Sequence, residues 1–126
     1  MILTKADLLE YINADAKASG RTSVKAKFWG DDIWKFCITL RKSEYYANKK
    51  GFSRYISLPL RLFYKMQFHN RSLRLGFSIP INVFGKGLAI VHYGTIVVAK
   101  SARIGENCRI HEGVTIGATN GSGQAA

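Results

Sequence analysis

The sequence predicts a protein of mixed α and β structure, in which a basic helical segment is followed by a parallel β-helix of six-residue repeats. Two observations predict this fold: apolar residues recur every three or four positions in the first part of the chain, and every six positions in the last part. We therefore divide the 126 residues into a helical segment, residues 1–76, and a repeat segment, residues 77–126.

The first expected helix follows Thr4. Thr4 and Asp7, three residues later, are typical of a capping box, and Gly20 is a stop signal. Between them lies an apolar stripe at helical spacing, formed by Leu8, Leu9, Ile12 and Ala16.

Two further helices are expected before residue 76. Asp31 or Asp32 can cap the second helix, and Gly51 would end it. Pro59 suits the first turn of a third helix, which would run from Leu60 to about Leu75. The apolar residues at helical spacing are Ile33, Phe36, Cys37 and Leu40 in the second helix, and Leu62, Phe63, Met66, Leu73 and Leu75 in the third.

A six-residue period organises the end of the chain. Val98, Ile104, Ile110 and Ile116 each open a short block: VAKSAR, IGENCR, IHEGVT and IGATNG. This period fits neither a helix nor a free strand, and it predicts a parallel β-helix whose first block residues face inward. One block before Val98 stands His92, so we expect a titratable ring within the aliphatic ladder.

Residues 76–126 resemble the hexapeptide-repeat acyltransferases, and most closely the serine acetyltransferase group. The resemblance rests on Gly85, Gly87 and His92, on the Val-Val continuation after Ile96, and on the VTIGAT segment before a Gly/Ser-rich loop. It implies a left-handed β-helix, acetyl-CoA as co-substrate and a homotrimer. Because relatives continue with further coils, it also implies that this chain is truncated at its C-terminus.

The resemblance implies the site residues as well. His92 matches the family's general base, which takes the proton of the acceptor hydroxyl, and histidine suits this role because it titrates near neutrality. Gly94 is the expected substrate-binding residue. The expected coenzyme-binding residues are Gly117, Thr119 and Gly121. Two basic residues leave two alternatives open: Lys100 and Arg103 either attract the coenzyme phosphates electrostatically or are solvated residues at the corners of the coils.

Three departures from the family pattern affect the acceptor. Phe77 stands where the family has the aspartate that orients the base, and Val91 replaces an acidic residue. The family's Arg-His pair is replaced by residues 124–126, Gln-Ala-Ala. The acceptor is therefore serine or another small alcohol, such as a sugar hydroxyl, and His92 is oriented by a backbone carbonyl or by a carboxylate distant in sequence.

The positive charge of residues 1–76 is the basis of one alternative function. Residues 1–76 hold 15 Lys and Arg against 6 Asp and Glu, a net charge of +9. A non-catalytic interaction module could use this basic segment to bind an anionic membrane or an acidic partner. Nucleic-acid binding is not expected, since no recognised motif accompanies the charge.

The two cysteines and the other two histidines do not indicate a further functional site. Cys37 and Cys108 have no metal-ligand spacing, so no metal is expected, and the absence of a leader-like segment predicts a cytoplasmic protein. His111 should point outward and His69 should lie on the third helix.

Overall fold

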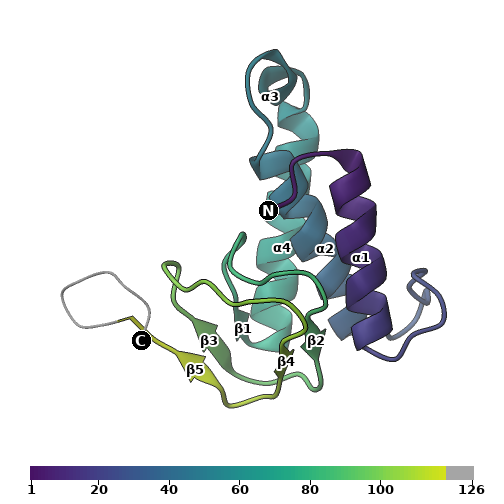
Figure 1. Cartoon of the computed structure of the whole chain (residues 1–126), viewed down its shortest axis with the longest axis vertical. Coiled ribbons are helices and arrows are strands. Elements are labelled where there is room, and N and C mark those ends of the chain that lie inside the picture. Colours follow the sequence, from purple (N-terminus) through teal and green to yellow (C-terminus); the bar gives the residue numbers. More distant parts are fainter. Residues whose placement is uncertain (119–126) are drawn as a thin grey trace.

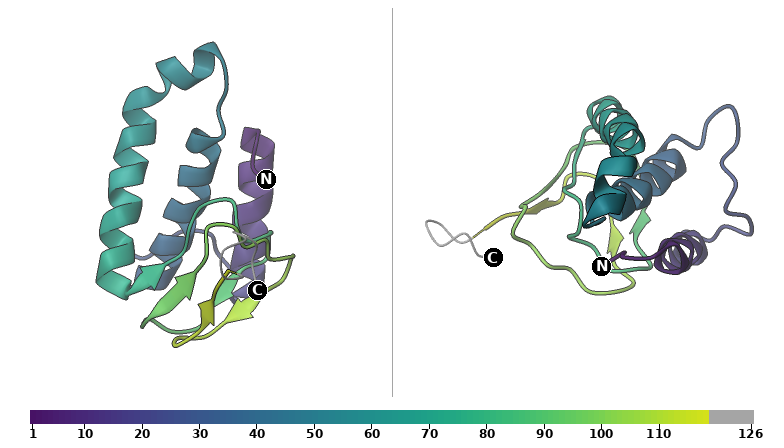
Figure 2. Two further views of the ribbon diagram at one scale, coloured as in Figure 1. Left: turned by 90° about the vertical axis from the view of Figure 1, so that its left-hand side faces the viewer. Right: turned by 90° about the horizontal axis from the view of Figure 1, so that it is seen from above.

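The computed structural model describes residues 1–118, which fold into four helices and five short strands (Figure 1). The helices are α1 (Lys5–Ala18), α2 (Asp32–Ala47), α3 (Phe52–Ile56) and α4 (Leu58–Leu75). The strands are β1 (Phe77–Ser78), β2 (Ala89–Ile90), β3 (Ile96–Val98), β4 (Arg109–Ile110) and β5 (Thr115–Ile116). Figure 2 shows α1, α2 and α4 side by side, with the strands gathered at one end of the helices.

The helix boundaries of α1 and α4 are formed by capping and turn residues. Thr4 caps α1, because its hydroxyl accepts from the Asp7 N–H while the Asp7 carboxylate accepts from the Thr4 N–H, which completes the capping box. Pro59 lies in the first turn of α4, where its missing N–H costs no helical hydrogen bond. Gly76 ends α4 in the left-handed conformation, with φ of 82°.

Three details differ from the expected helices. Asp31 precedes α2 with φ of 54°, and its side chain makes no capping hydrogen bond because its carboxylate binds Arg21 instead. Leu9 is 54% exposed, so the buried stripe of α1 excludes it. After Gly51 the chain forms the extra short helix α3, which the sequence analysis did not predict.

The strands pair in parallel in two small sheets. One sheet has the order β1-β3-β5, with Phe77 opposite Ile96 and Val98 opposite Ile116. The other pairs β2 with β4 and places Ile90 opposite Ile110.

The prediction of a left-handed β-helix is wrong for the described part of the chain. Its strands are two or three residues long and form separate sheets of three and two strands, with one isolated bridge between Phe84 and Ile104. The six-residue period determines which side chains face inward, but not what buries them. Val98 and Ile110 do face inward, and Ile104 packs against the same core, yet this core is shared with the helices.

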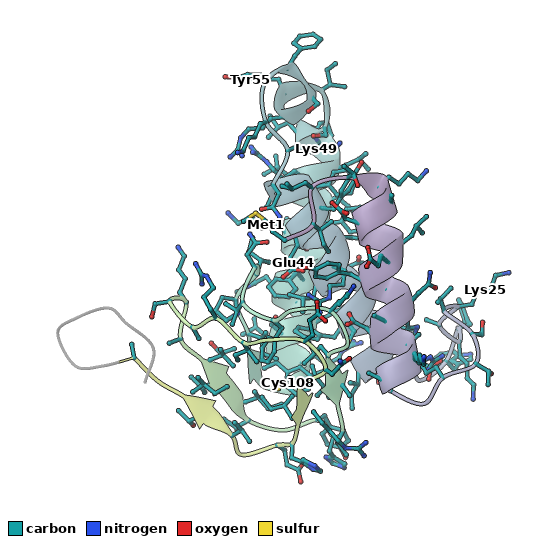
Figure 3. All side chains as sticks on the ribbon, in the orientation of Figure 1. Met1, Lys25, Glu44, Lys49, Tyr55 and Cys108 are labelled. Atoms are coloured by element: carbon teal, nitrogen blue, oxygen red, sulfur yellow. The ribbon has the colours of Figure 1, made fainter. Side chains whose placement is uncertain are left out.

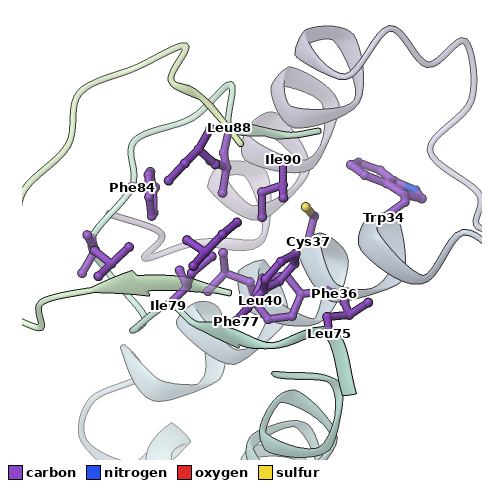
Figure 4. Packing of buried hydrophobic residues seen from close by; sticks show 14 of the residues in the cluster. Trp34, Phe36, Cys37, Leu40, Leu75, Phe77, Ile79, Phe84, Leu88 and Ile90 are labelled. Carbon is purple, nitrogen blue, oxygen red and sulfur yellow. The ribbon is translucent and has the colours of Figure 1, made fainter. Parts of the chain in front are cut away.

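One hydrophobic cluster joins helices and strands. Phe36 of α2 contacts Phe77 of β1 edge to face, with ring centroids 5.0 Å apart, and stacks with Phe68 of α4 on its other side. Figure 4 shows Phe77 and Ile79 next to Phe36 and Leu40 of α2. Burial against these helices explains how such short strands are held in place.

The long helix α4 leaves most of its apolar residues outside this cluster. Only Leu75 is buried, whereas Leu62, Phe63, Met66 and Leu73 are each more than half exposed. Within residues 1–118, no helix combines the length and apolar character needed to cross a membrane.

Candidate functional site

His92 lies in the short connection between β2 and β3. Backbone hydrogen bonds fix this connection on both sides of the ring: the Val91 N–H donates to the Ile110 carbonyl at 3.1 Å, and the Gly94 N–H donates to the Leu75 carbonyl at 3.0 Å. The backbone of His92 is therefore anchored both to β4 and to the end of α4.

A backbone carbonyl orients the His92 ring. Its Nδ1 lies 2.6 Å from the carbonyl oxygen of Tyr93, and the two rings are 4.3 Å apart between centroids. Because a carbonyl oxygen can only accept, Nδ1 must carry the proton in this contact. In the neutral ring Nε2 then has a free lone pair, which is the arrangement that a general base needs.

The expected inward position of His92 is wrong. Its side chain is exposed, so the cost of burying an imidazole does not constrain this position. The inward-facing pattern does not hold here, because His92 lies in the connection between β2 and β3, where residues 91–93 are all exposed. His111 and His69 are also exposed, as expected for His111, and the structure does not bring either of them into a hydrogen bond within residues 1–118.

Gly94 has a local structural reason to be glycine. Its φ is 136°, and a Cβ at this position would lie 2.9 Å from the Cβ of Glu112. Gly87 is constrained in the same way, with φ of 86° and Asn107 next to the position of a Cβ. These constraints account for both glycines through the backbone alone, so the substrate-binding role of Gly94 stays a prediction.

The residues expected to bind coenzyme A are only partly described. Gly117 follows β5 and is exposed, whereas Thr119 and Gly121 lie outside the described residues, as do residues 124–126. Lys100 and Arg103 are exposed, and the Arg103 guanidinium donates to the carbonyls of Lys100 and Ala102. Arg103 is thus held against its own turn, as the corner-residue interpretation expects.

Phe77, at the position of the family's aspartate, belongs to the core. Its side chain is 3% exposed and contacts Phe36. Val91, by contrast, is 39% exposed next to His92. The backbone-carbonyl alternative for orienting His92 is therefore the one that the structure contains, through Tyr93.

A cavity of about 340 Å³ adjoins the residue after His92. Tyr93 and Ile90 form one wall, and the end of α1 with the start of α2 forms the other. His92 itself does not line it. The remaining lining residues are Ser19, Arg21, Asp31, Asp32, Ile33, Trp34 and Cys37.

Hydrogen bonds and a cation–π contact connect the residues of the cavity wall. Arg21 donates to both carboxylate oxygens of Asp31, at 3.2 and 3.1 Å, and its guanidinium lies 5.1 Å from the centre of the Trp34 ring. Trp34 in turn donates from Nε1 to the Val24 carbonyl. This ion pair lowers the pKa of Asp31, since Arg21 and the Lys27 N–H bind its charged form. The cavity was not predictable from the sequence, because its lining residues belong to three separate segments.

Comparison with family models, curated proteins and solved structures found no match for this chain.

Proposed function

We propose that the protein is an acetyl-CoA-dependent O-acetyltransferase of the serine acetyltransferase kind, with His92 as its general base. The observation that carries the proposal is the 2.6 Å hydrogen bond from His92 Nδ1 to the Tyr93 carbonyl. It gives the neutral ring an unprotonated Nε2, and the exposure of the side chain makes that nitrogen accessible to substrates.

The reaction needs only one base. Nε2 of His92 takes the proton of the acceptor hydroxyl while the oxygen attacks the thioester carbonyl of acetyl-CoA. A C–O bond forms, the C–S bond breaks, and the departing thiolate receives the proton from the imidazolium. The Tyr93 carbonyl stabilises that imidazolium, because it accepts from Nδ1–H throughout.

We propose that an acceptor bound in the cavity next to Tyr93 extends its hydroxyl beyond the cavity to His92, which does not line it. The volume of the cavity suits a small alcohol, and its wall offers the Ser19 hydroxyl and the Asp32 carboxylate besides the Arg21–Asp31 pair. We propose serine or a sugar hydroxyl as acceptor, and assembly as a homotrimer, as the resemblance implies.

A thiol-release assay with acetyl-CoA and a panel of hydroxyl acceptors, including serine and simple sugars, tests the reaction. His92→Ala should lower turnover by about 10²–10⁴-fold, the usual contribution of a general base. His69→Ala is the matched control, because this exposed histidine lies on α4, away from the connection, and should leave turnover unchanged.

The acceptor site has a separate test. Ser19→Trp places a large ring at the mouth of the cavity, so it should raise KM for the acceptor without changing KM for acetyl-CoA. Near-normal turnover of a folded His92→Ala variant would refute the mechanism. Absence of thiol release with every acceptor would refute the proposed reaction.

A further inference from the structure

The end of the molecule farthest from the strands is apolar and exposed. We call it the α3 pole and define it as residues 49–63, which comprise the end of the α2–α3 connection, α3 and the first turns of α4. No residue of α3 is buried: Phe52 is 78% exposed, Tyr55 76% and Ile56 67%. Figure 1 shows α3 beyond the ends of the neighbouring helices, and Figure 3 shows Tyr55 pointing into solvent. Single exposed apolar residues are ordinary, but a contiguous group marks a surface that binds something.

The charged residues within this pole have one sign. Residues 45–105 contain no Asp or Glu. Lys50 and Arg54 are exposed next to and within α3, whereas the Lys49 ammonium lies against the Tyr45 ring, and Figure 3 shows Lys49 lower on the molecule than Tyr55. An apolar tip with a basic border is the composition of helices that lie in the interface of an anionic membrane.

A cleft runs from this pole along α4 towards the strands. It has a volume of about 450 Å³, and its apolar walls include Leu62, Phe68 and Ile81. Among residues 1–118, the charged residues that line it are Arg54, Arg61 and Lys65, and none carries a carboxylate.

Arg61 has a buried donor without an acceptor. Its Nη1 is shielded from solvent and makes no hydrogen bond within residues 1–118. A buried, unpaired guanidinium N–H is unfavourable. Arg61 also lines the cleft, and a side-chain rotation that turns Nη1 towards the cleft would let an anionic oxygen satisfy this donor. Phosphate and carboxylate are the groups whose geometry matches the arginine donors.

We propose that the α3 pole docks on an anionic phospholipid membrane. The side chains of Phe52, Tyr55 and Ile56 enter the boundary between headgroups and acyl chains, and the cleft takes a lipid phosphate at Arg61. A second copy of the chain is a poorer occupant of the same surface, because it would bring a second set of uncompensated positive charges to it. The proposal is independent of the acetyltransferase reaction.

Vesicle flotation tests the proposal. The protein should float with phosphatidylcholine vesicles that contain phosphatidylserine, and not with phosphatidylcholine alone. Binding should weaken with salt, since the screening length falls from about 10 Å at 0.1 M to about 3 Å at 1 M. Phe52→Ser combined with Tyr55→Ser should abolish flotation, and Arg61→Gln should reduce the preference for anionic vesicles.

The loop between α1 and α2 offers a matched control. Phe28 and Trp29 are 87% and 84% exposed there, so Phe28→Ser combined with Trp29→Ser removes a similar amount of exposed aromatic surface away from the pole. This variant should float like the unaltered protein, and so should Lys25→Gln, which removes one exposed positive charge from the same loop.

Three results would overturn the proposal. The first is equal recovery on neutral and anionic vesicles. The second is loss of flotation in the Phe28 and Trp29 variant but not in the pole variant. The third is a pole variant that sediments as a smaller species than the unaltered protein and yet still floats. This result would make the pole a contact between copies of the chain. All substituted residues except Arg61 are exposed, and Arg54→Gln provides a second charge variant at an exposed position of the cleft.

Discussion

Arg41 of α2 and Asp15 of α1 form a two-point ion pair inside the protein. Nε of Arg41 lies 2.6 Å from Oδ2 of Asp15, and Nη2 lies 3.1 Å from Oδ1, with both side chains almost completely buried. The remaining Arg41 donors reach Glu44 and the carbonyls of Phe84 and Gly85. The pair therefore joins two helices to the chain that leads into β2.

Asp15 extends this network into the strand segment. Its Oδ1 also accepts from the N–H groups of Gly87 and Leu88, at 2.9 and 2.8 Å. Glu44 does the same on the other side of Arg41, where Oε2 accepts from the Asn82 N–H. Each of the three charges in this network is thus paired and hydrogen-bonded, which is the condition under which buried charges are tolerated.

Replacement of Arg41 should be strongly destabilising. Burial alone would lower the pKa of Arg41, but its hydrogen bond with Asp15 and the nearby charge of Glu44 raise it, so the guanidinium stays charged. Arg41→Met would leave two buried carboxylates without a counter-charge, and it should lower the free energy of unfolding by about 3–5 kcal/mol. Urea denaturation at neutral pH measures this change.

The matched control for Arg41 is Arg21→Met. The Arg21–Asp31 pair is also a two-point contact, but both of its side chains are partly exposed. Solvent screens such a pair, so its loss should be much less destabilising than the loss of Arg41. Equal losses in the two variants would contradict the role assigned to Arg41.

Helix signals were readable from the sequence because they are local. The Thr4–Asp7 capping box and Pro59 in the first turn of α4 each depend on a few neighbouring residues. The Arg41 network was not readable, because its partners lie 26 and 43 residues away along the chain. No spacing rule distinguishes Arg41 from the solvated arginines of the helical segment.

The six-residue period predicted which residues are buried but not the fold that buries them. It correctly identified Val98 and Ile110 as inward-facing, since apolar periodicity reports burial. It failed on the architecture, because the core that receives these residues is built partly by α2 and α4, far away in sequence. The period also gave a wrong prediction for His92, because residues in the connection between two short strands need not follow the inward-facing pattern of the strands.

Ile110→Ala tests the shared core. Ile110 is 3% exposed in β4 and belongs to the cluster that includes Phe36 and Leu40. Its truncation should lower the free energy of unfolding by about 2–5 kcal/mol, because a cavity remains between helices and strands. Val97→Ala, at a position of β3 that is 39% exposed, should cost less than about 1 kcal/mol in the same urea titration. A small loss at Ile110 would mean that the core is not packed as described.

The two cysteines should differ in reactivity. Burial raises the pKa of the Cys37 thiol to about 12, and its side chain is 2% exposed between α2 and the strands. Since the thiolate is the reactive form, native Cys37 should resist iodoacetamide, whereas the partly exposed Cys108 should be alkylated first. Mass spectrometry after timed labelling separates the two sites, and unfolding in urea should remove the difference. Fast native alkylation of Cys37 would show that the helices open readily.

Asp31 should make stability depend on acid pH. Hydrogen bonds from Arg21 and the Lys27 N–H hold the pKa of Asp31 below its ordinary value of 3.8. Because the folded state favours the charged carboxylate, this contribution is fully present above about pH 4, near the ordinary pKa, and is lost as pH falls through the lower pKa of the folded state. Asp31→Asn should therefore be less stable than the unaltered protein at pH 7, and the difference should shrink as the pH falls to 3. Asparagine tolerates the left-handed backbone at this position, so the substitution removes the charge without adding strain. Urea midpoints of both proteins at the two pH values measure the effect, and a difference that stays constant between pH 7 and pH 3 would show that the carboxylate charge contributes nothing to folding.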